Sequence, residues 1–266
     1  MTLETKNVHI GYHDNEVISD LNLQFEAGKI HSILGPNGCG KSTLLKALGK
    51  QIQTTAGEVL FKNSDINIWS RKAFARELAF LMQVHESNPE VTVRQLIEYG
   101  RFPHKRKFER LNQEDQAIVD QAISLTHLVD LAERTVDRLS GGERQRAWIA
   151  MALAQQPAVL LLDEPTSYLD IHHQLEIIEL IKRLNIEQSI TIILVLHDIN
   201  QAAMISDQII VLQSGSLYDF GAPREVITQS MLRDVFKVDA EIKNTEMDSI
   251  SVYNFQLLKE SGSNNL

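Results

Sequence analysis

The first third of the chain consists of short apolar runs separated by polar turn signals. Runs of this length, bounded by turn residues, predict β-strands rather than helices. The dipeptides Asp14-Asn15 and Ala27-Gly28 mark two of the turns. The predicted strands are Leu3–Ile10, Val17–Phe25, Lys29–Leu34 and Glu58–Phe61.

The middle of the chain changes to a helical pattern. One helical pattern follows Gly40, and Ser70–Glu77 predicts a second helix that leads into the apolar strand Leu78–Met82. From about residue 84 to residue 155, apolar residues recur at three- and four-residue spacing, as on one face of a helix. The helices predicted in this inserted segment are Thr92–Tyr99, Gln113–Thr126 and Ser140–Gln155.

Strands and helices alternate in the last third. Short apolar strands separated by helices argue for a parallel sheet that is covered by helices on both faces. We therefore predict an α/β fold with N-terminal antiparallel strands and an inserted helical subdomain at about 84–155. The alternating elements are strand Ala158–Asp163, helix Ile171–Ile186, strand Ile190–Leu196, helix Ile199–Ile205 and strand Gln208–Leu212.

We expect residues 2–240 to form one domain and residues 241–266 a small C-terminal extension of unassigned role. A helix at Thr228–Phe236 and a strand at Ser249–Leu257 are predicted near this end. Trp69 and Trp148 are interpreted as packing residues.

The charge balance disfavours a nucleic-acid partner. The chain has 26 basic and 35 acidic residues, and a net charge of −9 repels phosphate backbones. The most basic stretch is Arg101–Arg110, with the sequence RFPHKRKFER. We interpret it as a solvated loop or helix face and expect no nucleic-acid partner.

Cysteine usage and hydropathy indicate a reducing compartment and a chain that does not cross a membrane. Cys39 is the only cysteine, so no disulfide can form within the chain and a reducing compartment is expected. The first twenty residues contain no continuous apolar stretch and predict no signal peptide. The apolar runs Ala158–Leu162 and Ile192–Leu196 are far shorter than the roughly 18 residues of a membrane span. We expect a soluble chain without a span of its own.

A glycine-rich segment between a predicted strand and a helix fits the pattern G-x-x-x-x-G-K-[ST]. Glycines let successive backbone N–H groups point at one phosphate, and the helix N-terminus adds a favourable dipole. Lys41 is expected to reach the β- and γ-phosphates, and Ser42 to place its hydroxyl on Mg²⁺. Cys39, beside Lys41 at the helix start, is expected to favour the thiolate. The predicted phosphate-binding residues are Gly35, Pro36, Asn37, Gly38, Cys39, Gly40, Lys41, Ser42 and Thr43.

The apolar strand Ala158–Asp163 ends in two carboxylates. Asp163 is expected to reach the Mg²⁺ shell at the carboxyl edge of the sheet. Glu164 is placed one residue further on, where a carboxylate could polarise an attacking water. Strands often end in acidic residues, so this motif gains its weight from the phosphate loop.

The segment Leu139–Gln145, with the sequence LSGGERQ, opens another predicted helix. Ser140 and Glu143 form an S-x-x-E capping box, which explains a helix start but does not require Gly141 and Gly142. Two bare glycines at a helix N-terminus suit a second anion site, because backbone N–H groups can approach a phosphate closely. Two phosphate-binding helix starts far apart in sequence suggest a shared ligand.

These motifs make the chain similar, from end to end, to the ATP-binding subunits of ABC transporters, with LSGGERQ matching the signature motif of that family. The resemblance implies a P-loop NTPase core. It also implies that Tyr12 stacks on adenine and that Gln83 contacts Mg²⁺ and water. His197 would bind the γ-phosphate, and Ser167–Asp170 would cross a dimer interface, although Tyr168 stands where the family more often has alanine.

The resemblance completes the expected site. The catalytic residues would be Glu164, His197 and Lys41, and the metal ligands Ser42, Gln83 and Asp163. The nucleotide would also contact Tyr12 and, across a homodimer that sandwiches two ATP molecules, Ser140, Gly141, Gly142 and Glu143. His172 and His173 are interpreted as surface or interface residues, and the remaining histidines are given no role.

The type of transporter also follows from resemblance. The stretches Tyr99–His104, Gln145–Gln155 and Tyr168–Ile171 are similar to subunits that import ferric siderophores, haem or cobalamin, most of all to the ferric-siderophore members. This implies a peripheral subunit on the cytoplasmic face of the membrane. Its partners would be permease subunits, docked near Gln83–Arg106, and indirectly an extracytoplasmic substrate-binding protein. A soluble ABC ATPase that acts on a nucleoprotein partner remains as an alternative, and the transported compound stays open. A single-site P-loop phosphotransferase is disfavoured, because it would give the LSGGERQ motif no role.

Overall fold

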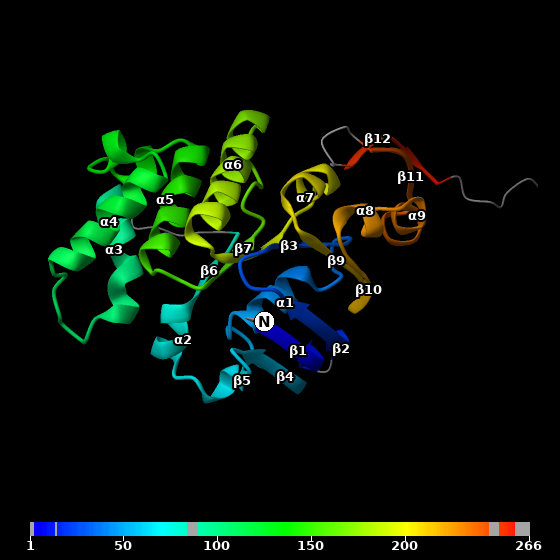
Figure 1. Cartoon of the computed structure of the whole chain (residues 1–266), viewed down its shortest axis with the longest axis horizontal. Helices are drawn as coiled ribbons and strands as arrows, with labels where there is room; N and C mark the ends of the chain where they lie inside the picture. The colour runs from blue at the N-terminus through cyan, green and yellow to red at the C-terminus, as the bar shows by residue number, and fades with distance from the viewer. Residues whose placement is uncertain (1–2, 14, 84–89, 245–249, 259–266) are drawn as a thin grey trace, which may run out of the picture.

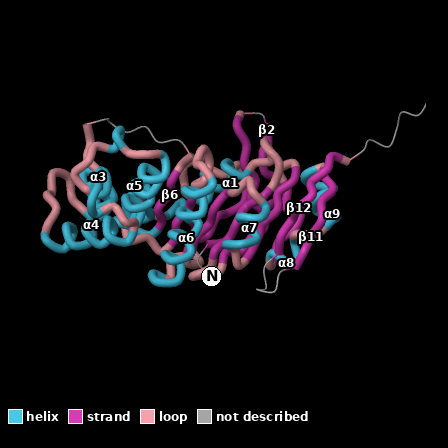
Figure 2. The backbone as a smooth tube through the Cα atoms, turned by 90° about the horizontal axis from the view of Figure 1, so that it is seen from above, coloured by secondary structure: helices cyan, strands magenta, loops and turns pink. Residues whose placement is uncertain are grey.

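The computed structural model describes residues 3–13, 15–83, 90–244 and 250–258. Asp14, at the first predicted turn, Ser249, at the start of the last predicted strand, and the beginning of the inserted segment at 84–89 lie outside the described residues. The chain forms two sheets of four and six strands, a helical part at one end, and a two-stranded sheet near the C-terminus (Figures 1 and 2).

The N-terminal strands form a four-stranded antiparallel sheet in the order β2-β1-β4-β5. Buried and exposed residues alternate along β1 and β2, as on a sheet with one covered face. The antiparallel strands expected here are confirmed, and β5 is a short addition. The strands are β1 (Leu3–Tyr12), β2 (Asn15–Phe25), β4 (Ala56–Phe61) and β5 (Ser64–Asp65).

The central six-stranded sheet has the order β10-β9-β3-β8-β7-β6. Five neighbouring strands run parallel, and β10 pairs antiparallel with β9. The parallel sheet is confirmed, whereas β10 was missed. Its strands are β3 (Ile30–Leu34), β6 (Leu78–Leu81), β7 (Val159–Asp163), β8 (Thr191–Val195), β9 (Gln208–Gln213) and β10 (Ser216–Gly221).

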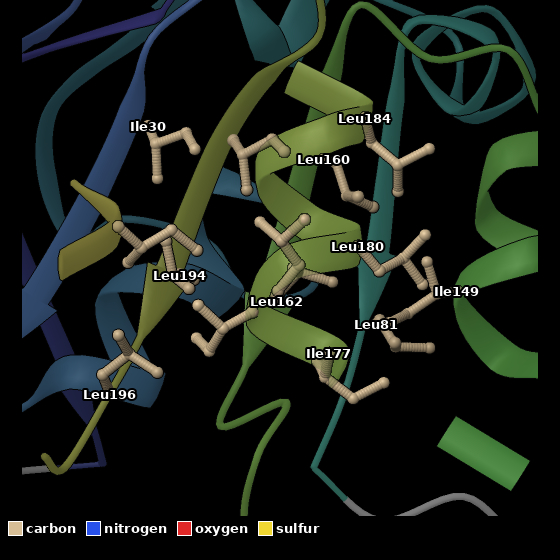
Figure 3. Packing of buried hydrophobic residues seen from close by; sticks show 14 of the residues in the cluster. Ile30, Leu81, Ile149, Leu160, Leu162, Ile177, Leu180, Leu184, Leu194 and Leu196 are labelled. Atoms are coloured by element: carbon tan, nitrogen blue, oxygen red, sulfur yellow. The ribbon is translucent and has the colours of Figure 1, made fainter. Parts of the chain in front are cut away.

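This sheet separates two cores. Alternate residues of a strand face opposite sides, so Leu161 packs with the antiparallel sheet and α1 (Lys41–Leu48), whereas Leu160 and Leu162 pack with helices on the other face. Figure 3 shows the second core, where Ile177, Leu180 and Leu184 of one helix lie against the strands. The helices along that face are α6 (Ile171–Gln188) and α7 (Ile199–Ile205).

The inserted segment is helical, as the periodicity predicts. Thr92, Asn112 and Ser140 each close a capping box at the start of a helix. Its described elements are α3 (Val93–Glu98), the 3₁₀ turns at Tyr99–His104, Val129–Leu131 and Val136–Arg138, α4 (Gln113–Leu125) and α5 (Gly141–Ala154). A 3₁₀ turn at Ile66–Ile68 and α2 (Arg71–Glu77) precede it along the chain.

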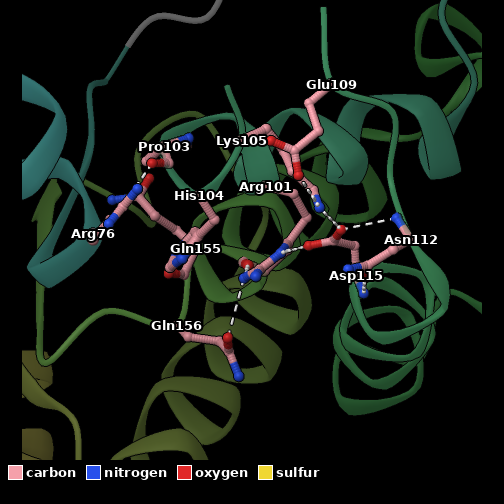
Figure 4. A network of polar contacts seen from close by, with 11 residues as sticks. Arg76, Arg101, Pro103, His104, Lys105, Glu109, Asn112, Asp115, Gln155 and Gln156 are labelled. Carbon is pink, nitrogen blue, oxygen red and sulfur yellow. Dashed lines mark hydrogen bonds and ion pairs between the residues drawn. The ribbon is translucent and has the colours of Figure 1, made fainter. Parts of the chain in front are cut away.

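The basic stretch Arg101–Arg110 was expected to be a solvated loop or helix face, and the structure shows that this is wrong for two of its residues. Arg101 and Lys105 are buried rather than solvated, because both pair with the buried carboxylate of Asp115 (Figure 4). The Nε atom of Arg101 lies 3.0 Å from Asp115 Oδ1, and Arg101 also donates to the carbonyl oxygen of Ala154. Burial favours the neutral acid, but hydrogen bonds from Lys105 and other neighbours keep the pKa of Asp115 below its usual value.

The C-terminal elements pack on the domain. Ala240, Ile250 and Val252 join the core beside α7, and the Asn200 side chain exchanges two hydrogen bonds with the backbone of Val252. The expected boundary at 240/241 falls inside a strand. The elements are α8 (Pro223–Val226), α9 (Gln229–Phe236), β11 (Val238–Asn244) and β12 (Ile250–Leu257).

The two tryptophans take part in packing. Trp69 and Trp148 are partly buried against the two cores, which confirms their packing role. None of the helices within the described ranges has the length and apolarity that a membrane crossing requires.

Candidate functional site

The glycine-rich loop joins β3 to α1. Gly35, Gly38 and Gly40 all have positive φ angles, which L-residues with side chains rarely adopt. A Cβ atom on Gly35 would lie 2.3 Å from the carbonyl oxygen of Leu212, and one on Gly40 would lie 2.5 Å from Cδ1 of Ile18. At Gly35 the backbone of β9 therefore leaves room for glycine only, whereas a side chain at Gly40 would have to displace Ile18 of β2.

Lys41 and Ser42 open α1 at the end of this loop. The Nζ atom of Lys41 donates hydrogen bonds to the carbonyl oxygens of Gly35 at 2.8 Å and Pro36 at 3.0 Å. Ser42 Oγ donates to Asp163 Oδ1 at 2.9 Å, which joins the phosphate loop to the end of β7. Burial raises the pKa of Asp163, and the hydrogen bond from Ser42 partly opposes that shift.

Glu164 follows β7 in a left-handed conformation, with φ of 52°. Its carboxylate is held from three sides. Oε2 accepts hydrogen bonds from Ser167 Oγ at 2.8 Å and Gln83 Nε2 at 2.5 Å, while Oε1 lies 2.5 Å from His197 Nε2. Gln83 follows β6 and His197 follows β8, so the carboxyl ends of three parallel strands bring these side chains together.

A pocket of about 190 Å³ lies between the phosphate loop and these strand ends. The positive end of α1 and the Lys41 ammonium face it from one side, and Glu164 and His197 line it too. The predicted loop and strand-end residues thus meet at one site. Val17 was missed, because it reaches the pocket only through the packing of β2 against the loop. The lining residues are Val17, Asn37, Gly38, Gly40, Lys41, Ser42, Thr43, Glu164 and His197.

The expectation for Cys39 is wrong. Its side chain is buried with an exposed fraction of 3%, and burial raises the pKa of the thiol despite the nearby Lys41. Its Sγ atom would lie 2.6 Å from a Cβ on Gly35, so the residue packs under the loop. Proximity to a cation and a helix start did not outweigh desolvation.

Two predicted elements lie outside this pocket. Tyr12 ends β1 and is 42% exposed, and it does not line the pocket. Ser140 and Glu143 form the predicted capping box at the start of α5, with Ser140 exposed. In Figure 1 the label of α5 lies in the helical part, away from α1. The residues predicted to bind the nucleotide therefore lie in separate parts of one chain.

Gly142 has a packing reason that the sequence did not reveal. A Cβ atom on Gly142 would lie 2.0 Å from Cδ2 of His173, whose imidazole presses on the start of α5. His173 Nδ1 lies 2.8 Å from Asp170 Oδ1, and Asp170 also caps α6. The neighbouring His172 is 77% exposed and Tyr168 is 92% exposed. His173 of α6 thus packs against Gly142 of the LSGGERQ motif.

The chain matches a known protein family over more than half its length. The family model described as "ABC transporter" covers residues 18–167, from β2 through the phosphate loop to Ser167. The iron(3+)-hydroxamate import ATP-binding protein of Bacillus subtilis is 47% identical over 91% of this chain and 90% of its own length. The ferric enterobactin transport ATP-binding protein of Escherichia coli is 40% identical over 88% of this chain and 86% of its own.

Solved structures give the same result. An ABC transporter described as being of the metal-chelate type, in an inward-facing conformation, matches with a TM-score of 0.83 and 28% identity, covering 98% of both chains. A dimeric bacterial ABC transporter cassette matches with a TM-score of 0.71 and 30% identity, covering 84% of this chain and 99% of its own.

Proposed function

The chain belongs to the ABC transporter family of ATP-binding proteins, and on that premise we propose that it hydrolyses ATP to drive uptake of an iron chelate, a ferric siderophore, through a separate permease. One observation carries the enzymatic part: Lys41, Ser42 and Glu164 converge on one pocket at the carboxyl edge of the sheet. The cargo rests on relatives named for iron(3+)-hydroxamate and enterobactin transport.

The phosphate loop binds the nucleotide. Its backbone N–H groups and the N-terminus of α1 neutralise phosphate charge. Lys41 exchanges the carbonyl oxygens of Gly35 and Pro36 for the β- and γ-phosphate oxygens. Buried in a pocket wall, its ammonium acts in a medium that screens it poorly.

The residues around Ser42 suit Mg²⁺. A hydroxyl and a carboxylate oxygen lie 2.9 Å apart beside the phosphate loop, and Mg²⁺ prefers such hard oxygen ligands together with substrate phosphates. When bound there, the ion would neutralise phosphate charge. Ser42 and Asp163 would hold it. Gln83 is the third proposed ligand, through its amide oxygen, while its nitrogen donates to Glu164.

Glu164 is the proposed general base. Its carboxylate lines the pocket and accepts hydrogen bonds that fix its orientation. Ser167 and Gln83 direct one oxygen, while His197 contacts the other and also lines the pocket. Glu164 would take a proton from the attacking water, and His197 and Lys41 would stabilise charge on the γ-phosphate oxygens.

The site is completed by a second copy of the chain. Ser140–Glu143 lies outside the pocket of its own chain, and a similar cassette is known as a dimer. In the homodimer, Ser140, Gly141, Gly142 and Glu143 of one subunit would face the γ-phosphate bound by the other, and Tyr12 would stack on adenine. ATP shifts the population to the closed dimer because it binds that form better.

The permease would dock where the core meets the helical part. A pocket of about 350 Å³ lies there, lined by Gly49–Gln51, Phe74, Phe80 and Gln155 among others. Met82, which directly follows β6, is 50% exposed. Residues 84–89 of the proposed docking segment Gln83–Arg106 lie outside the described residues. A subunit bound in this way would be peripheral on the cytoplasmic face, and a substrate-binding protein would act through the permease.

Uptake assays test the cargo. A strain that lacks this chain should lose uptake of one ferric siderophore from a panel of radiolabelled iron chelates, haem and cobalamin. Wild-type chain should restore it, and Lys41→Ala should not. Haem and cobalamin are the alternative cargoes. For cobalamin, an import ATP-binding protein of Halobacterium salinarum is 39% identical over 89% of this chain and 59% of its own length. Unchanged uptake of every compound would favour a soluble ABC ATPase.

A further inference from the structure

Exposed cations gather on one side of the helical part. Three lie on α2 and three on the loop that follows the 3₁₀ turn Tyr99–His104, and all six are exposed. The two segments lie side by side, because Arg76 Nε donates to the carbonyl oxygen of Pro103 at 2.8 Å and Lys72 donates to that of Lys105 (Figure 4). We call this surface the basic face; it consists of Arg71, Lys72, Arg76, Arg106, Lys107 and Arg110.

Three acidic residues beside the basic face are already paired. Glu109 binds Lys105 Nζ at 3.3 Å and the backbone N–H of Arg106 at 2.8 Å. Asp115 is buried between Arg101 and Lys105, and Glu77 pairs with Lys62 at 2.8 Å. Across the described parts of the chain, no carboxylate lies within ion-pair distance of the six cations. On a chain with a net charge of −9, this local positive charge stands out.

Two aromatic side chains project beside these cations. Phe108 is 92% exposed, at a loop position with φ of +66°, and the Lys107 ammonium lies 5.2 Å from the centre of its ring. Phe102 is 59% exposed. An exposed phenylalanine in a left-handed conformation carries two free-energy costs in water: its backbone conformation is sterically strained, and its apolar ring is exposed to solvent. Insertion of the ring among lipid headgroups would offset the hydration cost.

We infer that the basic face binds the headgroups of anionic phospholipids on the membrane that holds the permease. Clustered Lys and Arg residues with neighbouring aromatic rings are the chemistry that anionic bilayer surfaces recognise. The orientation rests on the proposed function, because α2 contributes both to the basic face and to the groove proposed for the permease. A long polyanion such as RNA fits less well, since the rest of the acidic chain repels it.

The test is co-sedimentation of the purified full chain with vesicles. Wild-type protein should bind vesicles that contain phosphatidylglycerol far better than vesicles of pure phosphatidylcholine, and added salt should weaken binding. Lys107→Glu with Arg110→Glu should weaken binding at least about thirtyfold, as expected for the loss of two cation–headgroup attractions. Phe108→Asn should also weaken binding without loss of folding, because asparagine tolerates a positive φ angle.

A matched control separates position from net charge. Lys6→Glu with Lys243→Glu changes the net charge equally at exposed sites on β1 and β11. Its binding should stay within about threefold of wild type, as expected when charges sit beyond a Debye length from the contact. ATP binding should be unchanged in all of these variants, so a failure here is distinct from a failure in uptake.

Three results would overturn the inference. These are equal binding to both kinds of vesicle, an equal loss in the control pair, and tighter binding of an RNA oligonucleotide that the vesicles cannot displace. The last would assign the basic face to nucleic acid.

Discussion

At the scale of single residues, the proposed chemistry depends on how the Glu164 carboxylate is held. A carboxylate that accepts hydrogen bonds from Ser167 and Gln83 and contacts His197 has little freedom to reorient. The left-handed backbone at Glu164 directs it from the end of β7 into the pocket. In the proposed mechanism, this fixed geometry would favour proton transfer from a water beside the γ-phosphate.

Glu164→Gln should therefore separate binding from turnover. The amide keeps the shape of the side chain and can still accept a hydrogen bond from Ser167, but it cannot accept a proton. We expect ATP turnover to fall by about 10²–10⁴-fold while the dissociation constant for ATP changes little. Steady-state phosphate release and equilibrium nucleotide binding measure the two effects. Glu187→Gln, at an exposed position of α6, is the control. Turnover close to wild type in Glu164→Gln would exclude Glu164 as the base.

At the scale of helices and strands, the sequence predicted what local chemistry determines. The S-x-x-E capping box placed the start of α5, and the three- and four-residue apolar spacing placed α3 and α4. Apolar runs placed the parallel strands. The polar strand β10 was missed, because its burial pattern contains no fully buried residue that would give an apolar run. Arg101 was misjudged and Val17 was missed for a different reason, because the environment of each comes from a segment distant in sequence. Arg101 pairs with Asp115 on α4, and Val17 lies against the phosphate loop.

The contact between α5 and α6 is a feature that sequence periodicity could not predict, and it can be tested. Gly142→Ala should lower the free energy of unfolding by about 1–3 kcal/mol, because the new methyl group collides with the His173 ring. Gly141→Ala is the matched control, since its Cβ would lie 3.2 Å from Leu169 Cδ2 at an exposed position. It should be close to neutral. Urea unfolding measures both variants.

A second substitution shows whether the collision is the cause. In the double variant Gly142→Ala with His173→Ala, the ring is absent, so the combined loss should be smaller than the sum of the single losses. Additive losses, or equal losses for the two glycine variants, would mean that the ring does not constrain this helix start.

At the scale of the whole molecule, the two helix starts that are proposed to bind phosphate lie in different parts of the chain. The start of α1 lies in the core between the two sheets, and the start of α5 lies in the helical part (Figure 1). Only the first lines the pocket with Glu164 and His197 among the described residues. A second chain is the simplest way to bring an α5 start to an occupied phosphate loop, which makes the proposed dimer testable by complementation.

Ser140→Asp and Lys41→Ala together provide that test. Aspartate caps helices as well as serine does, so Ser140→Asp should preserve α5 while it places a negative charge where the partner's γ-phosphate would approach. Ser140→Asn caps equally well without the charge and should retain much more activity.

Each of the two defective homodimers should be inactive, because both of its sites carry one defect. In a mixed dimer, one site carries both defects and the other pairs an intact phosphate loop with an intact Ser140. ATPase activity should therefore reappear when the two inactive variants are mixed and allowed to exchange subunits. If each site lay within one chain, every site would keep one defect and mixing would restore nothing. If turnover instead requires both sites of a dimer to be intact, mixing restores no activity even though the site is shared. Gel filtration of the Glu164→Gln protein with and without ATP identifies this case, because it measures ATP-dependent dimerisation directly. Absence of both recovery and dimerisation would contradict the shared site.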